Sequence, residues 1–198
     1  MIKYANGKNF QNNLKIPSKS PTKPKSFSHG NRGMAFESDI NETNDYYRNH
    51  GLCLVTKRPT PINVVEVDYS KGAIITNAYF EKQSTTDYNG VFNGMYLDFE
   101  AKSTRKKTSF PLANISKHQI EHLKQVIKHK GIAFFIIEFS ELDEVYYLDA
   151  QYVINFYENG ERKSIPYSII KEVGKRIKKA FAPRLDYLEI IQELHGKS

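Results

Sequence analysis

The chain has 198 residues, 39% of them hydrophobic, and a formal net charge of +7, which favour one compact globular domain over a disordered chain. No apolar run reaches the roughly 18 residues that a membrane span needs, and the N-terminus lacks the apolar core of a signal peptide. The single cysteine, Cys53, cannot form an internal disulfide, so we expect a cytoplasmic protein in which Cys53 is buried and unreactive.

The positive charge is concentrated at the N-terminus. Seven basic residues and no acidic residue precede Glu37, and the whole chain has 29 Lys and Arg against 22 Asp and Glu, so residues 37–198 are formally neutral. A segment rich in Asn, Ser, Pro and Lys packs poorly, whereas clustered cations neutralise phosphates. Residues 1–30 are therefore predicted to form a flexible basic arm that binds nucleic acid. A solvated tail that only aids solubility is the alternative.

The first half of the chain predicts a helix, a strand and a hairpin. We expect the helix over about 34–49 and the strand over 52–59. Two β-branched runs, 62–70 and 73–81, surround the tight-turn signal Lys71-Gly72, which is typical of a β-hairpin. Because this hairpin interrupts the segments on either side, it is predicted to project from the main body.

The second half alternates strand and helix signals. Asn93-Gly94 indicates a tight turn between two strands. The later elements expected are a helix over 114–130, a buried strand over 132–139, a strand over 145–150, a basic helix over about 166–180 and a last helix over about 184–195. This order describes an α/β domain with a mixed central sheet.

The segment between Asp87 and Lys102 carries the candidate catalytic residues. Asp87 and Glu100 are separated by the Asn93-Gly94 turn, which can bring the second strand back beside the first. Side chains two residues apart on a strand leave the same face, so Asp98, Glu100 and Lys102 are expected to face outward, opposite the apolar residues between them. Two ionised acids and a lysine in a row beside a predicted core call for a chemical reason.

Phosphodiester cleavage supplies such a reason. Carboxylates bind Mg²⁺ as hard oxygen ligands, and the metal polarises a phosphate and generates hydroxide from bound water. A neighbouring lysine can stabilise the negative charge of the transition state. Asp87, Glu100 and Lys102 are therefore predicted to be the catalytic residues of an Mg²⁺-dependent nuclease, with Mn²⁺ as an alternative ion. On spacing alone, an edge strand with a solvated charged face stays an open alternative.

Longer segments are more specific than this spacing. They are NRGMAFE (31–37), KRPTPINVV (57–65), AYFEKQSTTDYNG (78–90), YLDFEAKST (96–104), TSFPLANISKHQIEHLK (108–124) and APRLDYL (182–188). In this order, the segments resemble RecU-type Holliday junction resolvases of Gram-positive bacteria and mollicutes, members of the restriction-endonuclease-like nuclease superfamily. The resemblance covers nearly the whole chain apart from the arm.

The resemblance implies a fold and an activity. The fold would be restriction-endonuclease-like, a mixed central sheet flanked by helices, in a nuclease domain over 31–198 that a projecting β-rich stalk at about 59–82 interrupts. The activity would be that of a homodimer that cuts four-way DNA junctions symmetrically in recombination and repair. Relatives also interact with recombinase and branch-migration proteins.

The resemblance also implies roles for individual residues. Thr85, Asp87 and Glu100 would be metal ligands, with Gln119 on the following helix contributing to the metal site. Lys102 would stabilise the transition state.

Four further residues are expected to contact DNA. Arg32 lies in the NRG motif, Lys57 lies before the stalk, and Lys71 lies within it. Many relatives carry a Lys-Arg pair after the stalk tyrosine, whereas Lys71 is the only cation at that place here, so stalk contacts with DNA are expected to be weaker. Phe110 follows a Thr-Ser pair in an expected polar loop, and we hypothesise that it faces a base or the DNA backbone.

Three alternatives compete with the resolvase interpretation. His118, Glu121 and His122 fit an inverted zinc-protease motif, although the basic arm would serve no purpose in a peptidase. A restriction-type nuclease acting on duplex DNA would share the catalytic residues but would not need the hairpin insertion. A non-catalytic scaffold that binds junctions would not need an acidic pair beside a lysine.

Overall fold

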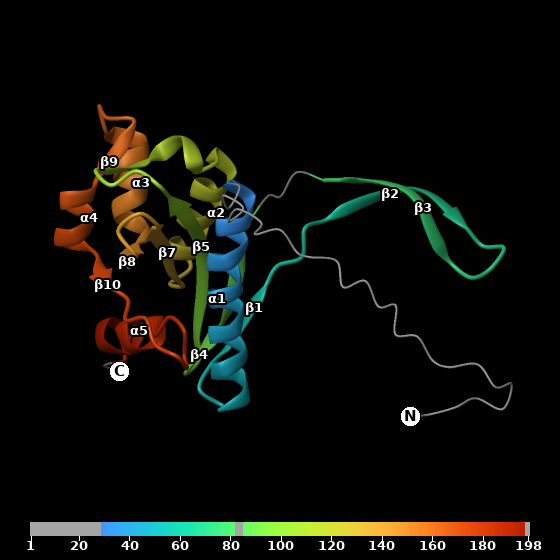
Figure 1. Cartoon of the computed structure of the whole chain (residues 1–198), viewed down its shortest axis with the longest axis horizontal. Coiled ribbons are helices and arrows are strands. Elements are labelled where there is room, and N and C mark those ends of the chain that lie inside the picture. Colours follow the sequence, from blue (N-terminus) through green and yellow to red (C-terminus); the bar gives the residue numbers. More distant parts are fainter. Residues whose placement is uncertain (1–28, 82–84, 197–198) are drawn as a thin grey trace, which may run out of the picture.

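A six-stranded mixed sheet forms the centre of the protein (Figure 1). The computed structural model describes residues 29–81 and 85–196, and side chains from residue 33 onward. In sheet order the strands are β1 (Leu54–Lys57), β4 (Tyr88–Phe92), β5 (Met95–Thr104), β7 (Ile132–Phe139), β8 (Glu144–Asp149) and β10 (Lys175–Arg176). Only β5 and β7 are parallel neighbours, and the other pairs are antiparallel. The predicted α/β class with a mixed central sheet is confirmed.

Helices cover both faces of this sheet. On one face, α1 (His29–Asn49) and α5 (Tyr187–His195) pack against Phe99 and Phe134. On the other face, α2 (Lys117–Lys128), α3 (Ala150–Asn159) and α4 (Tyr167–Val173) pack against Phe135 and neighbouring side chains. Alternate residues of β7 therefore enter different cores, which explains the nearly continuous apolar run of that strand. Among helices of the described residues, none is long and apolar enough to cross a membrane.

A separate two-stranded hairpin projects from the body (Figure 1). It consists of β2 (Ile62–Asp68) and β3 (Ile74–Phe80), which pair antiparallel with each other. Nearly all of its side chains are exposed, so the hairpin is held by its own backbone pairing. Its two ends are close together, because Glu81 N donates to the carbonyl oxygen of Pro61 at 2.9 Å. The predicted projecting insertion is confirmed.

The tight turn that precedes β5 sets the register between β4 and β5. Asn93 and Gly94 have φ values of 47° and 78°, and two successive positive values favour a two-residue hairpin turn. The turn pairs Tyr88 with Phe99 and so brings the beginning of β4 opposite the middle of β5.

Several predicted boundaries were wrong. The basic helix expected over 166–180 ends at Val173, because Gly174 follows and the next two residues pair with the free edge of β8. The helix expected over 114–130 begins at Lys117, after the 3-10 turn η1 (Leu112–Asn114). The sequence patterns also missed α3 and the small sheet of β6 (Ser109–Pro111) and β9 (Ser164–Pro166). The expected basic arm lies outside the described residues up to residue 28, and α1 already begins at His29.

Candidate active site

Asp87, Glu100 and Lys102 meet where β4 begins beside the middle of β5. The backbone N–H of Asp87 donates to Glu100 Oε2 at 3.1 Å, and Lys102 Nζ lies 2.7 Å from Glu100 Oε1. The loop that precedes β4 is thus attached to one carboxylate oxygen of Glu100, and Lys102 lies beside the other. The turn between the two strands produces this arrangement.

The acids of β5 are buried, contrary to the expectation that they face outward. Asp98 and Glu100 both have a relative exposure of 0%, and the side chain of Lys102 is 23% exposed. The strand lies between β4 and β7, and α2 packs over the face that carries these acids. An edge strand with a solvated charged face is therefore excluded.

Burial changes the proton affinity of Glu100. Loss of solvent raises the pKa of its carboxyl to about 8, the Lys102 ammonium opposes that rise, and the charge of Asp87 adds to it. A buried acid with this tendency gains from a nearby cation, because the cation favours the ionised form. The environment of Glu100 is thus suited to a bound metal ion.

Thr85 and Gln119 lie on two segments that border the strands of this acidic pair, the loop before β4 and helix α2. Thr85 is half-buried in the loop that leads to Asp87, and Gln119 is 5% exposed in the first turn of α2. Because α2 is the crossover between two parallel strands, it runs back along β5, and its N-terminal turn lies toward the half of β5 that carries Glu100. Gln119 Oε1 accepts from Ser116 N at 3.0 Å, and an amide oxygen keeps a second lone pair.

The oxygen donors of these four residues fit Mg²⁺. Two carboxylates, a hydroxyl and an amide oxygen are hard ligands, and Mg²⁺ is typically held by one or two carboxylates together with water and substrate phosphate. In the described part of the chain, no three His, Cys, Asp or Glu residues gather as a metal-binding group. Two acids and two neutral oxygens are hard donors of the kind that divalent ions such as Mg²⁺ accept, whereas softer metals prefer nitrogen or sulfur.

The zinc alternative on α2 is not supported. His122 points to the sheet, with Nε2 3.0 Å from Asp98 Oδ2, and does not form a metal-binding group with His118 and Glu121. The same contact places His122 against the sheet, with its side chain 22% exposed.

A buried polar cluster beside the active site was missed. Its centre is Asp98, which contacts Arg58, Thr86, Tyr96 and His122. Burial acts to raise the pKa of Asp98, but the hydrogen bonds from His122, Arg58 and Thr86 outweigh it and hold that pKa below its ordinary value. The sequence offers no local signal for the cluster, because its members come from four separate segments.

The residues expected to contact DNA are spread over the molecule. Lys57 ends β1, pairs with Tyr88 beside the active site, and forms a 2.5 Å ion pair with Glu37 of α1. Lys71 is exposed in the turn between β2 and β3, whereas Lys57 precedes the hairpin at the end of β1. The side chain of Arg32 lies outside the described residues.

Phe110 requires a correction. Its relative exposure is 0%, and it lies on β6, paired with Ile165 of β9 inside the core of the α2 face. The side chain is therefore a packing residue that faces no DNA. The polar pair Thr108-Ser109 was misleading, because Phe110 lies on β6 with its side chain in the core.

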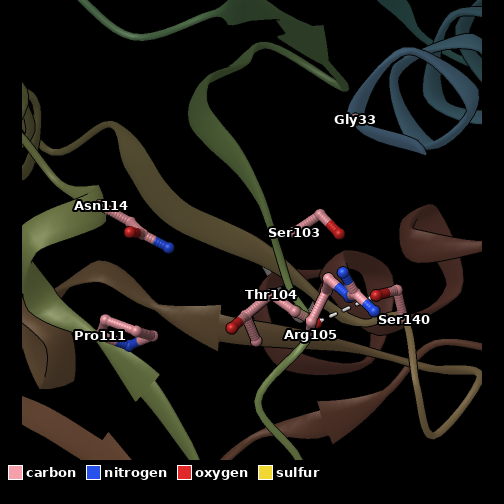
Figure 2. A pocket seen from close by; sticks show the side chains of 7 residues that line it. All are labelled: Gly33, Ser103, Thr104, Arg105, Pro111, Asn114 and Ser140. Carbon is pink, nitrogen blue, oxygen red and sulfur yellow. Dashed lines mark hydrogen bonds between the residues drawn. The ribbon is translucent and has the colours of Figure 1, made fainter. Parts of the chain in front are cut away.

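A polar hollow of about 400 Å³ lies beyond the end of β5 (Figure 2). Its lining residues are Gly33, Ser103, Thr104, Arg105, Pro111, Asn114 and Ser140. Several of its polar groups already have partners within the protein: Ser103 Oγ donates to Glu138, Ser140 Oγ donates to the carbonyl oxygen of Thr104, and Arg105 Nε donates to Glu141. The lining of this hollow includes none of the residues predicted for the site, so it is separate from the acidic pair.

Comparison with known proteins identifies the family. A family profile described as Recombination protein U matches residues 31–193. The Holliday junction resolvase RecU of Geobacillus sp. (strain WCH70) is 47% identical over 200 residues, and that of Bacillus cytotoxicus is 49% identical over 199 residues, with 98% of both chains covered in each case. A solved structure of Archaeoglobus fulgidus Hjc, described as a Holliday junction resolvase, aligns with 72% of this chain and 94% of its own at 13% identity and a TM-score of 0.44. The matched length and the identity to both RecU proteins show that this chain belongs to the recombination protein U family.

Proposed function

We propose that the protein is an Mg²⁺-dependent endonuclease that resolves four-way (Holliday) DNA junctions by symmetric nicking in recombination and repair. The observation that carries this proposal is the meeting of Asp87, Glu100 and Lys102 at one point of a sheet, in a chain whose relatives are named Holliday junction resolvase RecU. Binding alone would not require a buried acid beside a second acid and a lysine.

The residues of the site divide two tasks between them. Thr85, Asp87, Glu100 and Gln119 would hold the metal, which when bound polarises the phosphodiester and lowers the pKa of bound water. Lys102 is a cation held 2.7 Å from Glu100 and stabilises the negative charge that develops on the phosphate. Water attacks in line, leaving 5′-phosphate and 3′-hydroxyl ends.

Symmetric cutting requires two copies of this site. The described residues of one protomer hold one such site, and two strands of like polarity must be nicked, so we propose a homodimer with two-fold symmetry. The projecting hairpin is an insertion that a cutter of plain duplex would not need, and we propose that it enters the junction centre. Cytoplasmic location, the basic arm as a DNA-binding segment, and contact with recombinase and branch-migration proteins complete the proposal.

The test compares a four-way junction with a linear duplex of matching sequence, each with Mg²⁺ and with a chelator. We expect paired nicks in the junction with Mg²⁺, no cleavage with the chelator, and an intact duplex. Equal cleavage of the duplex would instead identify a restriction-type nuclease. Junction binding without cleavage in any divalent metal would identify a scaffold.

A further inference from the structure

Asp98 is the most completely bonded acid among the described residues close to the active site, yet the proposed reaction assigns it no role. Its Oδ1 accepts from the hydroxyl of Thr86, and its Oδ2 accepts from Arg58 Nη2 at 2.7 Å and from Tyr96 Oη at 2.8 Å. His122 Nε2 lies 3.0 Å from the same Oδ2. A carboxylate oxygen has about two lone-pair sites, so three neighbours fill Oδ2, while Oδ1 is bonded to Thr86.

Two of these neighbours, Arg58 and Thr86, lie at the base of the projecting hairpin, one on each side of the insertion. Arg58 directly follows β1 on the outgoing side, and Thr86 precedes Asp87 on the returning side. The two sides of the base are also bonded to each other. Arg58 Nη1 donates to Thr86 Oγ1 at 2.6 Å, and the Arg58 backbone N–H donates to the Asp87 carbonyl oxygen at 2.7 Å. Asp98 thus connects both sides of the hairpin base, Arg58 and Thr86, to β5.

The same loop is attached to β5 at a second point. The Asp87 N–H donates to Glu100, two residues along the strand from Asp98. Thr86 and Asp87 are therefore anchored to two successive acids on one face of β5. This double attachment fixes how the carboxylate of Asp87 and the hydroxyl of Thr85 lie relative to Glu100.

His122 extends the connection to α2. It lies one helical turn after Gln119, the fourth residue proposed to hold the metal. The segments that supply Thr85 and Asp87, Glu100, and Gln119 thus converge on one fully buried carboxylate.

We propose that Asp98 is a positioning residue that holds the loop 85–87 and helix α2 in register with Glu100. This inference rests on the proposed function for its effect on cleavage, but its structural part does not. Residues that orient metal ligands through hydrogen bonds typically change activity or metal affinity about 10- to 100-fold when they are replaced. Misplacement of reacting groups by about 1 Å can have an effect of the same size.

The test uses Thr86→Val, which keeps the shape of the side chain but removes the hydroxyl between Asp98 and Arg58. Thr86→Ser restores the hydroxyl. Thr43→Val is the matched control, because Thr43 is also 0% exposed and its hydroxyl accepts from Leu185 N at 3.0 Å, in the α1 and α5 region away from the site. Asp98→Asn is a second variant that removes the charge.

Two measurements are made on the full-length chain. The first is single-turnover cleavage of a four-way junction together with the junction dissociation constant. We expect Thr86→Val and Asp98→Asn to cleave about 10- to 100-fold more slowly with unchanged junction affinity, Thr86→Ser to recover most of the rate, and Thr43→Val to cleave as the wild type does. The second is hydrogen exchange of the peptide that contains residues 85–92, which should quicken in Thr86→Val and not in Thr43→Val.

The outcomes separate the inference from the function. Wild-type protein that cuts no junction would refute the proposed function, while the exchange measurement would still decide whether Asp98 holds the loop. Unchanged exchange and unchanged cleavage in Thr86→Val would overturn the inference. An equal loss of cleavage in Thr43→Val would also overturn it, because the effect would then follow from stability alone.

Discussion

Lys102 Nζ lies 2.7 Å from Glu100 Oε1, and this contact joins a partly exposed cation to a fully buried acid. An ion pair at a protein surface contributes little, but here the acid is out of water and its pKa is raised to about 8. Lys102 is the nearest counter-charge that opposes the rise. A partly exposed lysine therefore opposes the effect of burial on the pKa of Glu100.

Loss of either acid should abolish cutting without loss of binding. We expect Asp87→Asn and Glu100→Gln each to lower single-turnover cleavage about 100-fold or more, because a neutral amide is a far weaker magnesium ligand than a carboxylate. Junction affinity, measured by gel shift, should stay at the wild-type value. Glu158→Gln is the control, since it removes a carboxylate from an exposed ion pair with Lys124. Wild-type rates in both site variants would refute the site assignment.

Lys102 should act mainly on the chemical step. Lys102→Met is expected to lower the cleavage rate about 10²- to 10³-fold, the usual loss when one group that stabilises transition-state charge is removed. Lys124→Met removes an exposed lysine paired with Glu158 at 2.6 Å and should cleave normally. If Lys102→Met instead weakened junction binding and left the rate at saturation unchanged, Lys102 would be a DNA-binding residue.

The hairpin should control junction recognition rather than folding. Because Glu81 N bonds the Pro61 carbonyl, a short Gly-Ser linker can replace residues 62–80. We expect an unchanged melting temperature and a junction affinity about tenfold weaker or more, equivalent to about 1.4 kcal/mol. The experiment combines a thermal melt with gel shifts on junction and duplex. An unaltered preference for the junction would show that the hairpin takes no part in recognition.

Phe110 should matter for stability and not for DNA. Phe110→Ala is expected to lower the free energy of unfolding by about 3–5 kcal/mol, because it leaves a cavity in the core of the α2 face. Phe110→Leu fills much of that space and should bind junctions with wild-type affinity. Denaturant titration and gel shifts test the two statements. A loss of junction affinity in a stable Phe110→Leu protein would contradict the packing role.

Cys53 should react slowly while the protein is folded. Burial raises the pKa of its thiol to about 11, and Sγ lies 3.3 Å from the Val91 carbonyl oxygen. With such a pKa, only about one thiol in a thousand is ionised at pH 8, and the fraction grows about tenfold per pH unit up to that pKa. Alkylation by iodoacetamide should therefore be slow at pH 8, quicken with pH, and become fast in denaturant. Labelling of the native protein as fast as a free thiol would contradict this prediction.

Local sequence patterns were sufficient for features that depend on near neighbours. The apolar run of β7, the Asn93-Gly94 turn and the hairpin around Lys71 were each predicted from a few adjacent residues. The reason is that turn conformation and strand periodicity are set by the backbone preferences of those residues themselves. The same holds for the spacing of Asp87, Glu100 and Lys102, which follows from the turn between their strands.

Only the tertiary structure decided which face of β5 is buried and what its acids contact. Asp98 is buried because α2 crosses over it, and its partners Arg58, Thr86 and His122 come from segments up to 40 residues away in the chain. Phe110 is buried because β9 pairs with its strand. The predicted helix ends at Val173 because Lys175 and Arg176 pair with the edge of β8 instead. Burial and hydrogen-bond partners depend on long-range contacts, which no local pattern of residues contains. The sequence by itself predicted the candidate residues Asp87, Glu100 and Lys102 and the turn that joins their strands, and the packing of α2 on the sheet decided the buried setting in which they lie.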